Sequence, residues 1–162
     1  MRVGRLEVPA HVPGLRVAAE DGIIVGGSGL GQIRAVIADR AAAMHDRDAE
    51  RFTAHYAPQV VKFDLPPPLQ LTGPQARDAE ALRAWFASHP GGPVDYQIRD
   101  LTVTACGEVA FCHSLVQLGG ALWFRSTIGF RKTGGTWQIT HEHNSTPFYM
   151  DGSDKAALDL QP

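Results

Sequence analysis

The feature that most constrains the fold is a change of sequence pattern near residue 94. Before it, apolar residues recur at helical spacing. After it, four long stretches alternate apolar and polar residues and are separated by short turns containing glycine. Helices followed by consecutive hairpin-connected strands are typical of an α+β domain with an antiparallel sheet. The predicted strands are residues 94–104, 108–118, 122–132 and 136–144.

The part of the chain before residue 94 predicts three helices and a short pair of strands. Ile33, Ile37 and Met44 lie on one apolar stripe of the first predicted helix. Asp48 is a suitable N-cap for the second helix, and Pro74 suits the first turn of the third. The predicted helices are residues 30–44, 48–56 and 74–89, and the predicted short strands are residues 60–65 and 69–71.

Length and composition indicate a single globular domain. The chain has 162 residues, 44% hydrophobic and 20% charged, with a net charge of −2. Without a basic surplus, binding to nucleic acid or to an anionic membrane has no electrostatic support. No apolar run reaches the length of a signal peptide or a membrane span, so we expect a cytoplasmic protein. Cys106 and Cys112 do not form a disulfide framework and are expected to be buried thiols.

The chain is expected to consist of an N-terminal arm at residues 1–28, a domain at 29–150 and a short tail at 151–162. A glycine-rich stretch at residues 22–31 invites a dinucleotide-binding interpretation. Its spacing fails, because Gln32 stands where the third glycine of the motif is required. We therefore expect a flexible hinge here, with Ser28 as a possible helix N-cap, and no cofactor.

Two stretches near the C-terminus carry a family resemblance. They are RSTIGFRK at residues 125–132 and GTWQITHEHNSTPF at residues 135–148. With the predicted order of elements, the chain resembles the SnoaL-like and ketosteroid-isomerase-like branch of the NTF2-like superfamily. The resemblance implies a curved sheet wrapped over three helices as a cone, a pocket at its open end, and a homodimer. The superfamily includes isomerases, dehydratases, cyclases and domains without catalysis, so the fold does not decide the function.

Asp64 is the strongest candidate for a catalytic group. The resemblance implies a general base here, because ketosteroid isomerases have a similar Tyr-Ala run, as at Tyr56, before their catalytic aspartate. A carboxylate in an apolar pocket is the group such chemistry requires, although a surface aspartate at a strand end is an equal alternative. Arg40 stands where those isomerases have an oxyanion-binding tyrosine. Residues 109–118 contain no acid that could complete the oxyanion hole, so steroid isomerisation itself is not expected.

His141 and His143 alternate along the last predicted strand and are expected to share one face with Trp137 and Ile139. If residues 133–135 form the hairpin loop, Arg125 lies opposite His143, and Thr127 lies opposite His141. A two-residue loop would instead turn Arg125 to the other face. We prefer the first register, because the pattern of the family that the chain resembles has its glycine at the last loop position. It places a cation, a hydroxyl and two imidazoles together, where they could hold an anionic or carbonyl ligand.

Glu142 is expected on the opposite face, as a charge in solvent or at an interface. Zinc is an alternative for the histidine pair, with Asp64 or His113 as a third ligand, but we predict no metal site. Further ligand-binding residues are expected among the aromatic and polar side chains around the pocket. They are Tyr56, Phe63, Trp85, His113, Trp123, Thr127 and His141.

The sequence therefore favours a small-molecule-binding protein. Its activity would be that of an isomerase, dehydratase or cyclase acting on a carbonyl-containing or polyketide-like compound. Asp64 would be the base, and His143 and Arg125 would polarise the carbonyl. The alternative is a non-catalytic ligand-binding or dimerisation module. Either alternative allows a dimer formed through an outward apolar face of the third long strand, with Phe124, Ile128 and Phe130 exposed.

Overall fold

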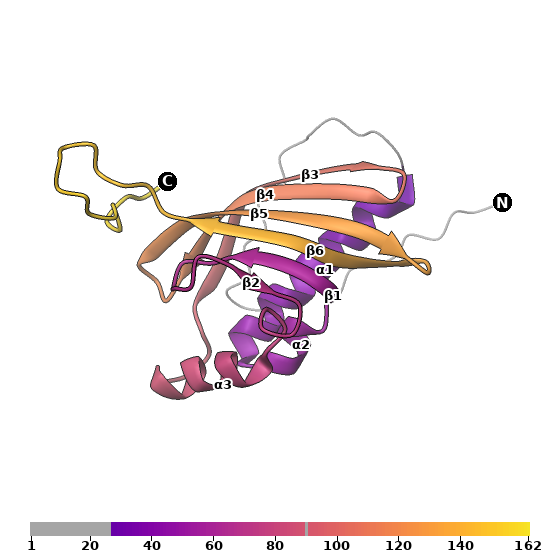
Figure 1. Ribbon diagram of the computed structural model, residues 1–162, viewed down its shortest axis with the longest axis horizontal. Coiled ribbons are helices and arrows are strands. Elements are labelled where there is room, and N and C mark those ends of the chain that lie inside the picture. The colour runs from indigo at the N-terminus through magenta and orange to yellow at the C-terminus, as the bar shows by residue number, and fades with distance from the viewer. Residues whose placement is uncertain (1–26, 90) are drawn as a thin grey trace.

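The computed structural model describes residues 27–89 and 91–162, which form a six-stranded sheet with three helices on one of its faces (Figure 1). The helices are α1 (Gly27–Asp46), α2 (Ala49–Thr53) and α3 (Ala79–Ser88). The strands are β1 (Tyr56–Phe63), β2 (Leu71–Thr72), β3 (Tyr96–Cys106), β4 (Val109–Leu118), β5 (Leu122–Thr133) and β6 (Thr136–Ser145). The α+β class and the cone-like order of elements are thereby confirmed.

The long helix α1 packs its apolar stripe against the sheet. Ile33, Ile37 and Met44 are buried, as the helical spacing predicts. Gly29 allows the helix to approach β6 closely, because a β-carbon there would lie 3.3 Å from the Trp137 ring. The helix begins at Gly27, so residues 27–31 of the glycine-rich stretch are helical and Ser28 lies inside the first turn. The remainder of that stretch, and nearly all of the predicted arm at residues 1–28, lie outside the described residues.

Two boundaries differ from the sequence prediction. Asp48 caps α2 as expected, and its side chain accepts a hydrogen bond from the Arg51 amide, but the helix ends at Thr53 and Tyr56 already belongs to β1. The third helix starts at Ala79 rather than near Pro74, because Asp78 is its N-cap and accepts from the Glu80 amide. Both differences arise where local capping or strand pairing overrides the apolar pattern.

The strand order is β2-β1-β6-β5-β4-β3. All neighbouring strands are antiparallel except β1 and β6, which run parallel. This parallel pairing sets Lys62 beside Glu142 and Phe63 beside His143. The pairing therefore joins the helical half of the chain to the C-terminal strand. Because Lys62 and Glu142 lie opposite each other, both residues are on the inner face of the sheet, toward the helices.

The hairpin between β5 and β6 has a two-residue loop, because Thr133 pairs with Thr136. The predicted three-residue loop is therefore wrong. The register shifts again between the Phe130–Ile139 pair and the Gly129–His141 pair, which leaves Thr140 as the extra residue of a β-bulge.

The bulge reverses the alternation of β6. Trp137 and Ile139 face the core, and beyond Thr140 it is Glu142 and Asn144 that are buried. The prediction that the two histidines share a face with Trp137 and Ile139 is wrong for this reason.

The inner face of the sheet carries the apolar core. Phe124, Ile128 and Phe130 are buried there, so the prediction that they form an exposed face is wrong. Both cysteines are free, as expected, but Cys106 is exposed and only Cys112 is buried. None of the helices in the described part of the chain is long and apolar enough to span a membrane.

Candidate functional site

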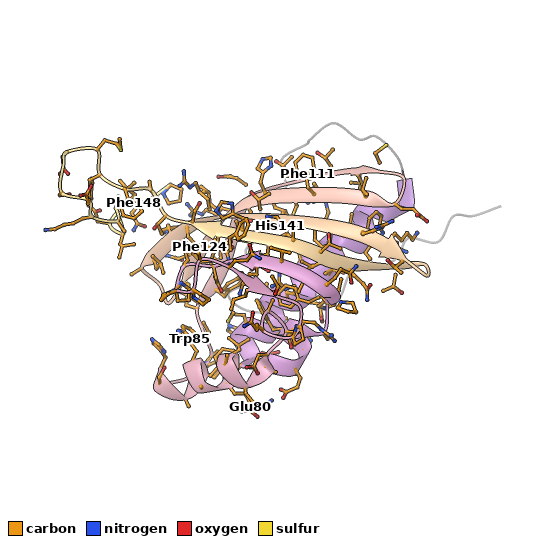
Figure 2. All side chains as sticks on the ribbon, in the orientation of Figure 1. Glu80, Trp85, Phe111, Phe124, His141 and Phe148 are labelled. Carbon is orange, nitrogen blue, oxygen red and sulfur yellow. The ribbon has the colours of Figure 1, made fainter. Side chains whose placement is uncertain are left out.

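A cavity of about 490 Å³ lies between the inner face of the sheet, helices α2 and α3, and the loop after β1. Most of its wall is apolar: Trp85 lies on the side of α3 that faces the sheet, and Phe124 contributes from β5 (Figure 2). Its polar groups come mainly from β1, β3 and β6. A pocket with apolar walls and a few convergent polar groups is the usual form of a small-molecule site. The principal apolar residues of its wall are Phe52, Leu65, Leu71, Leu82, Trp85 and Phe124.

Glu142 is the anchor of the polar end. Its side chain is buried, with only 4% of the residue exposed. Its carboxylate accepts hydrogen bonds from the Arg40 guanidinium at 2.8 Å, the Tyr56 hydroxyl at 2.6 Å and the Asn144 amide at 3.0 Å. Burial opposes its charge, but Arg40, Lys62 and these hydrogen bonds outweigh burial and lower the pKa of Glu142 to about 2. Glu142 lies on the opposite face from the histidines, as predicted, but the prediction that it is a charge in solvent or at an interface is wrong.

Asp64 lies at the cavity, just beyond the end of β1. One carboxylate oxygen lies 2.5 Å from the Lys62 ammonium. The other accepts from the Asn144 amide at 3.1 Å and from the Leu65 backbone amide at 3.0 Å. Asn144 therefore bridges Asp64 and Glu142 with its two N–H groups. Together with Lys62, these three side chains form one continuous network.

Lys62 supplies the cation at this end of the cavity. Its place in the register opposite Glu142 points its side chain inward, and its ammonium meets Asp64. Burial favours the neutral amine, but Tyr56, Glu142 and Asp64 together raise the pKa of Lys62. Lys62 therefore stays charged and can donate hydrogen bonds to a ligand.

Tyr96, at the start of β3, also lines the cavity. Its hydroxyl makes no hydrogen bond with any residue of 27–89 or 91–162, in contrast to Tyr56, which donates to Glu142 and accepts from Arg40. Burial raises the pKa of Tyr96 to about 12, so the hydroxyl keeps its proton. Tyr96 is therefore a neutral donor facing the cavity.

The predicted cation–histidine cluster lies on the other face of the sheet. Arg125, Thr127 and His143 are exposed, His141 is half-buried, and none of them lines the cavity. They do share a face, because the pairs are Thr127 with His143 and Gly129 with His141. The shorter hairpin loop and the bulge each shift the pairing of β5 with β6 by one residue from the predicted register. A shift of two residues leaves these side chains on one face of the sheet but changes which residues lie opposite each other.

The predicted ligand-binding residues divide between the two faces. Tyr56 and Trp85 line the cavity as expected. His113 is exposed opposite Thr127, and Trp123 donates to Gln161 of the C-terminal tail. The Phe63 ring packs edge-on against both histidines of β6, at centroid distances of 5.1 and 5.6 Å. The prediction that Arg125, His143, His113, Trp123, Thr127, His141 and Phe63 surround the cavity is wrong.

The zinc alternative gains no support. Across residues 27–89 and 91–162, no three histidine, cysteine, aspartate or glutamate side chains are grouped closely enough to hold a metal ion. The sequence reasoning also missed five polar residues that form or support the site, namely Arg40, Lys62, Tyr96, Glu142 and Asn144. The alternation of Lys62 with Asp64 was a usable signal, whereas Glu142 and Asn144 depend on a bulge that alternation cannot reveal.

Comparison with solved structures supports the fold. An NTF2-like protein of unknown function from Pseudomonas putida is 34% identical, with a TM-score of 0.74, and the match covers 85% of this chain and 100% of that one. An NTF2-like protein with a cystatin-like fold from Novosphingobium aromaticivorans is 23% identical, with a TM-score of 0.57 and coverages of 82% and 88%. A candidate dehydratase of the NTF2-like family from Streptomyces avermitilis is 17% identical, with a TM-score of 0.57 and coverages of 72% and 94%.

Comparison of the sequence gives a consistent result. No curated protein matches the chain. The model of the SnoaL-like domain matches residues 33–149, which include the residues of the polar network and almost the whole of the domain predicted at 29–150. On this match and on the similarity to the Pseudomonas putida structure, the chain belongs to the SnoaL-like domain family of the NTF2-like superfamily.

Proposed function

We propose that the protein binds a small carbonyl compound in the cavity and moves a proton on the carbon next to the carbonyl group. The observation that carries the proposal is the contact of Asp64 with Lys62 at the cavity, which sets a carboxylate and a protonated donor side by side. Asp64 would take the proton, and Lys62 would stabilise the negative charge that develops on the carbonyl oxygen. In this proposal Lys62 takes the role that the sequence suggested for Arg125 and His143.

The network behind the pair supports this assignment. Asn144 holds Asp64 from the side of Glu142, and Glu142 is itself fixed by Arg40 and Tyr56. A carboxylate that is held by hydrogen bonds to buried neighbours keeps a defined position relative to a ligand. Proton transfer of this kind is common to isomerases, dehydratases and cyclases, and the choice among them depends on the substrate.

A ligand-binding module without catalysis is the second candidate. Both oxygens of Asp64 already have partners, Lys62 on one and Asn144 with the Leu65 amide on the other. A base must turn one lone pair toward the substrate, so this engagement favours binding without proton transfer unless the ligand draws Lys62 away.

The test uses 6-propionyl-2-(dimethylamino)naphthalene, a neutral ketone whose fluorescence reports binding. Incubation in heavy water exchanges the protons next to its carbonyl when a base removes them, and mass spectrometry measures the gain in mass. We expect exchange faster than in buffer, lost in Asp64→Asn while binding persists, and unchanged in Asp151→Asn, which alters an exposed tail residue. Binding without exchange would establish the second candidate instead.

We also propose that two copies associate through the outer face of the sheet. Val109 and Phe111 are 58% and 47% exposed there, and Phe111 projects on the side of the sheet away from the helices (Figure 2). Apolar side chains grouped on a sheet face are a common basis of association. These residues replace the ones from which the sequence predicted a dimer.

A further inference from the structure

We propose that the cavity is built for an uncharged ligand and that Tyr96 and Lys62 are the two donors that bind its carbonyl oxygen. This inference rests on the proposed function and adds the charge class of the ligand and an orienting residue. It follows from the charges at the polar end of the cavity and from the hydrogen bonds that its side chains have left to make.

The charges at the polar end balance within the protein. Arg40 pairs with Glu142 at 2.8 Å, and Lys62 pairs with Asp64 at 2.5 Å, so two cations face two anions. The one further charged residue of the cavity wall is Asp78, which is exposed at the rim and caps α3. A charged ligand would therefore bring an uncompensated charge into a buried site, which is costly.

Lys62 and Tyr96 are the side chains at this end with hydrogen-bond donors left for a ligand, whereas the Asn144 amide oxygen also has no partner among the described residues but is itself buried. The Tyr56 hydroxyl donates to Glu142 and accepts from Arg40, and both N–H groups of the Asn144 amide are engaged. Lys62 has three N–H groups and forms an ion pair with Asp64 alone among the described residues, and the Tyr96 hydroxyl is unpartnered within the same part of the chain. A ligand that satisfies both must present an acceptor, as a ketone, aldehyde or ester oxygen does.

The apolar walls determine the rest of the ligand. Trp85 on α3 and Phe124 on β5 line the same cavity, from the helical side and from the sheet (Figure 2). Leu82 and Leu71 also belong to the wall. A ring system or an apolar chain gains most from burial between such groups. The ligand class is therefore an uncharged, largely apolar carbonyl compound small enough for about 490 Å³.

Three naphthalenes with the same dimethylamino group test the charge class. They are the neutral 6-propionyl ketone, the 2-naphthoate and the 2-naphthylmethylammonium ion, each titrated against the full chain by fluorescence. We expect the ketone to bind at least about tenfold more tightly than either ion. Asp64→Asn leaves one excess cation and should raise the relative affinity for the naphthoate. Lys62→Met leaves one excess anion and should raise the relative affinity for the ammonium ion.

Tyr96→Phe tests the orienting residue. It should weaken binding of the ketone by about fivefold, the effect of one lost hydrogen bond, and leave the two ions unchanged relative to each other. It should also shift the ketone's emission to shorter wavelength, a readout that a merely structural role would not move. Tyr149→Phe, at an exposed residue beyond the end of β6, is the matched control and should change neither.

The results distinguish the charge class of the ligand, the role of Tyr96 and the proposed function from one another. Tighter binding of the naphthoate or the ammonium ion to the unaltered protein overturns the uncharged class and leaves a small-molecule function standing. An unchanged affinity and emission in Tyr96→Phe overturns the role of Tyr96. Binding of none of the three compounds overturns this inference together with the proposed function.

Discussion

Replacing Arg40 by leucine removes one partner of the buried pair with Glu142. Both residues are at most 5% exposed, so the carboxylate left behind cannot be solvated without opening the core. Breaking a buried pair by removing one partner costs about 3–5 kcal/mol of unfolding free energy. Lys62, Tyr56 and Asn144 still surround Glu142, so we expect the lower end, about 3 kcal/mol, and a melting temperature lowered by roughly 10 °C.

The assay is urea unfolding followed by tryptophan emission, with Arg131→Leu as the control. Arg131 is exposed on β5 and does not contact Glu142, so its loss should change the unfolding free energy by less than about 0.5 kcal/mol. The double variant Arg40→Leu/Glu142→Leu should recover part of the loss, because it removes the charge that the single variant leaves buried.

The pH dependence of the unfolding free energy tests whether the buried charge of Glu142 causes the loss of stability. The pKa of Glu142 falls from 4.5 to about 2 on folding, so its stabilisation is complete above about pH 4.5 and is lost as the pH falls toward about 2. Arg40→Leu should raise the folded pKa of Glu142, so the difference from the unaltered protein should shrink as the pH is lowered from about 6 to 3. Equal stability of the two proteins at neutral pH would refute the reasoning.

Three further predictions follow from other parts of the chain. Deletion of Thr140 should cost less stability than deletion of Thr127, because removing a bulge residue keeps every side chain of β6 on its face; a larger loss measured by urea unfolding would contradict the bulge. The protein should sediment as a dimer at micromolar concentration, with Phe111→Asp shifting it toward the 17.5 kDa monomer; a monomer in the unaltered protein would contradict the proposed association. Calorimetry should detect no binding of NADH or ATP; saturable binding that is lost in Gly29→Trp would show that the glycine-rich stretch binds nucleotide after all.

Much of the fold is readable from the sequence because it depends on patterns within single elements. The stripe of α1 and the alternation of β3, β4 and β5 each report one buried face, and the positive-φ glycines 119, 134 and 135 mark two of the turns. These signals give the elements and their order, which is sufficient to recognise the family.

The candidate site is less readable because it depends on the register between elements. The bulge at Thr140 turns Glu142 and Asn144 inward and both histidines outward, and a strictly alternating count gives the reverse. The parallel pairing of β1 with β6, which brings Lys62 to Glu142, joins residues 80 positions apart and leaves no local trace. Asp64 could be predicted from the sequence because it follows the Tyr-Ala run at Tyr56 in β1, which resembles the run before the catalytic aspartate of ketosteroid isomerases.

The central claim is that the cavity, and not the outer face with Arg125 and His143, is the functional site. A crystal structure with the neutral naphthyl ketone tests it most directly. The account predicts the ring system between Trp85 and Phe124, with the carbonyl oxygen within hydrogen-bonding distance of the Lys62 ammonium. A ketone bound on the outer face of the sheet, with the cavity empty, would contradict it.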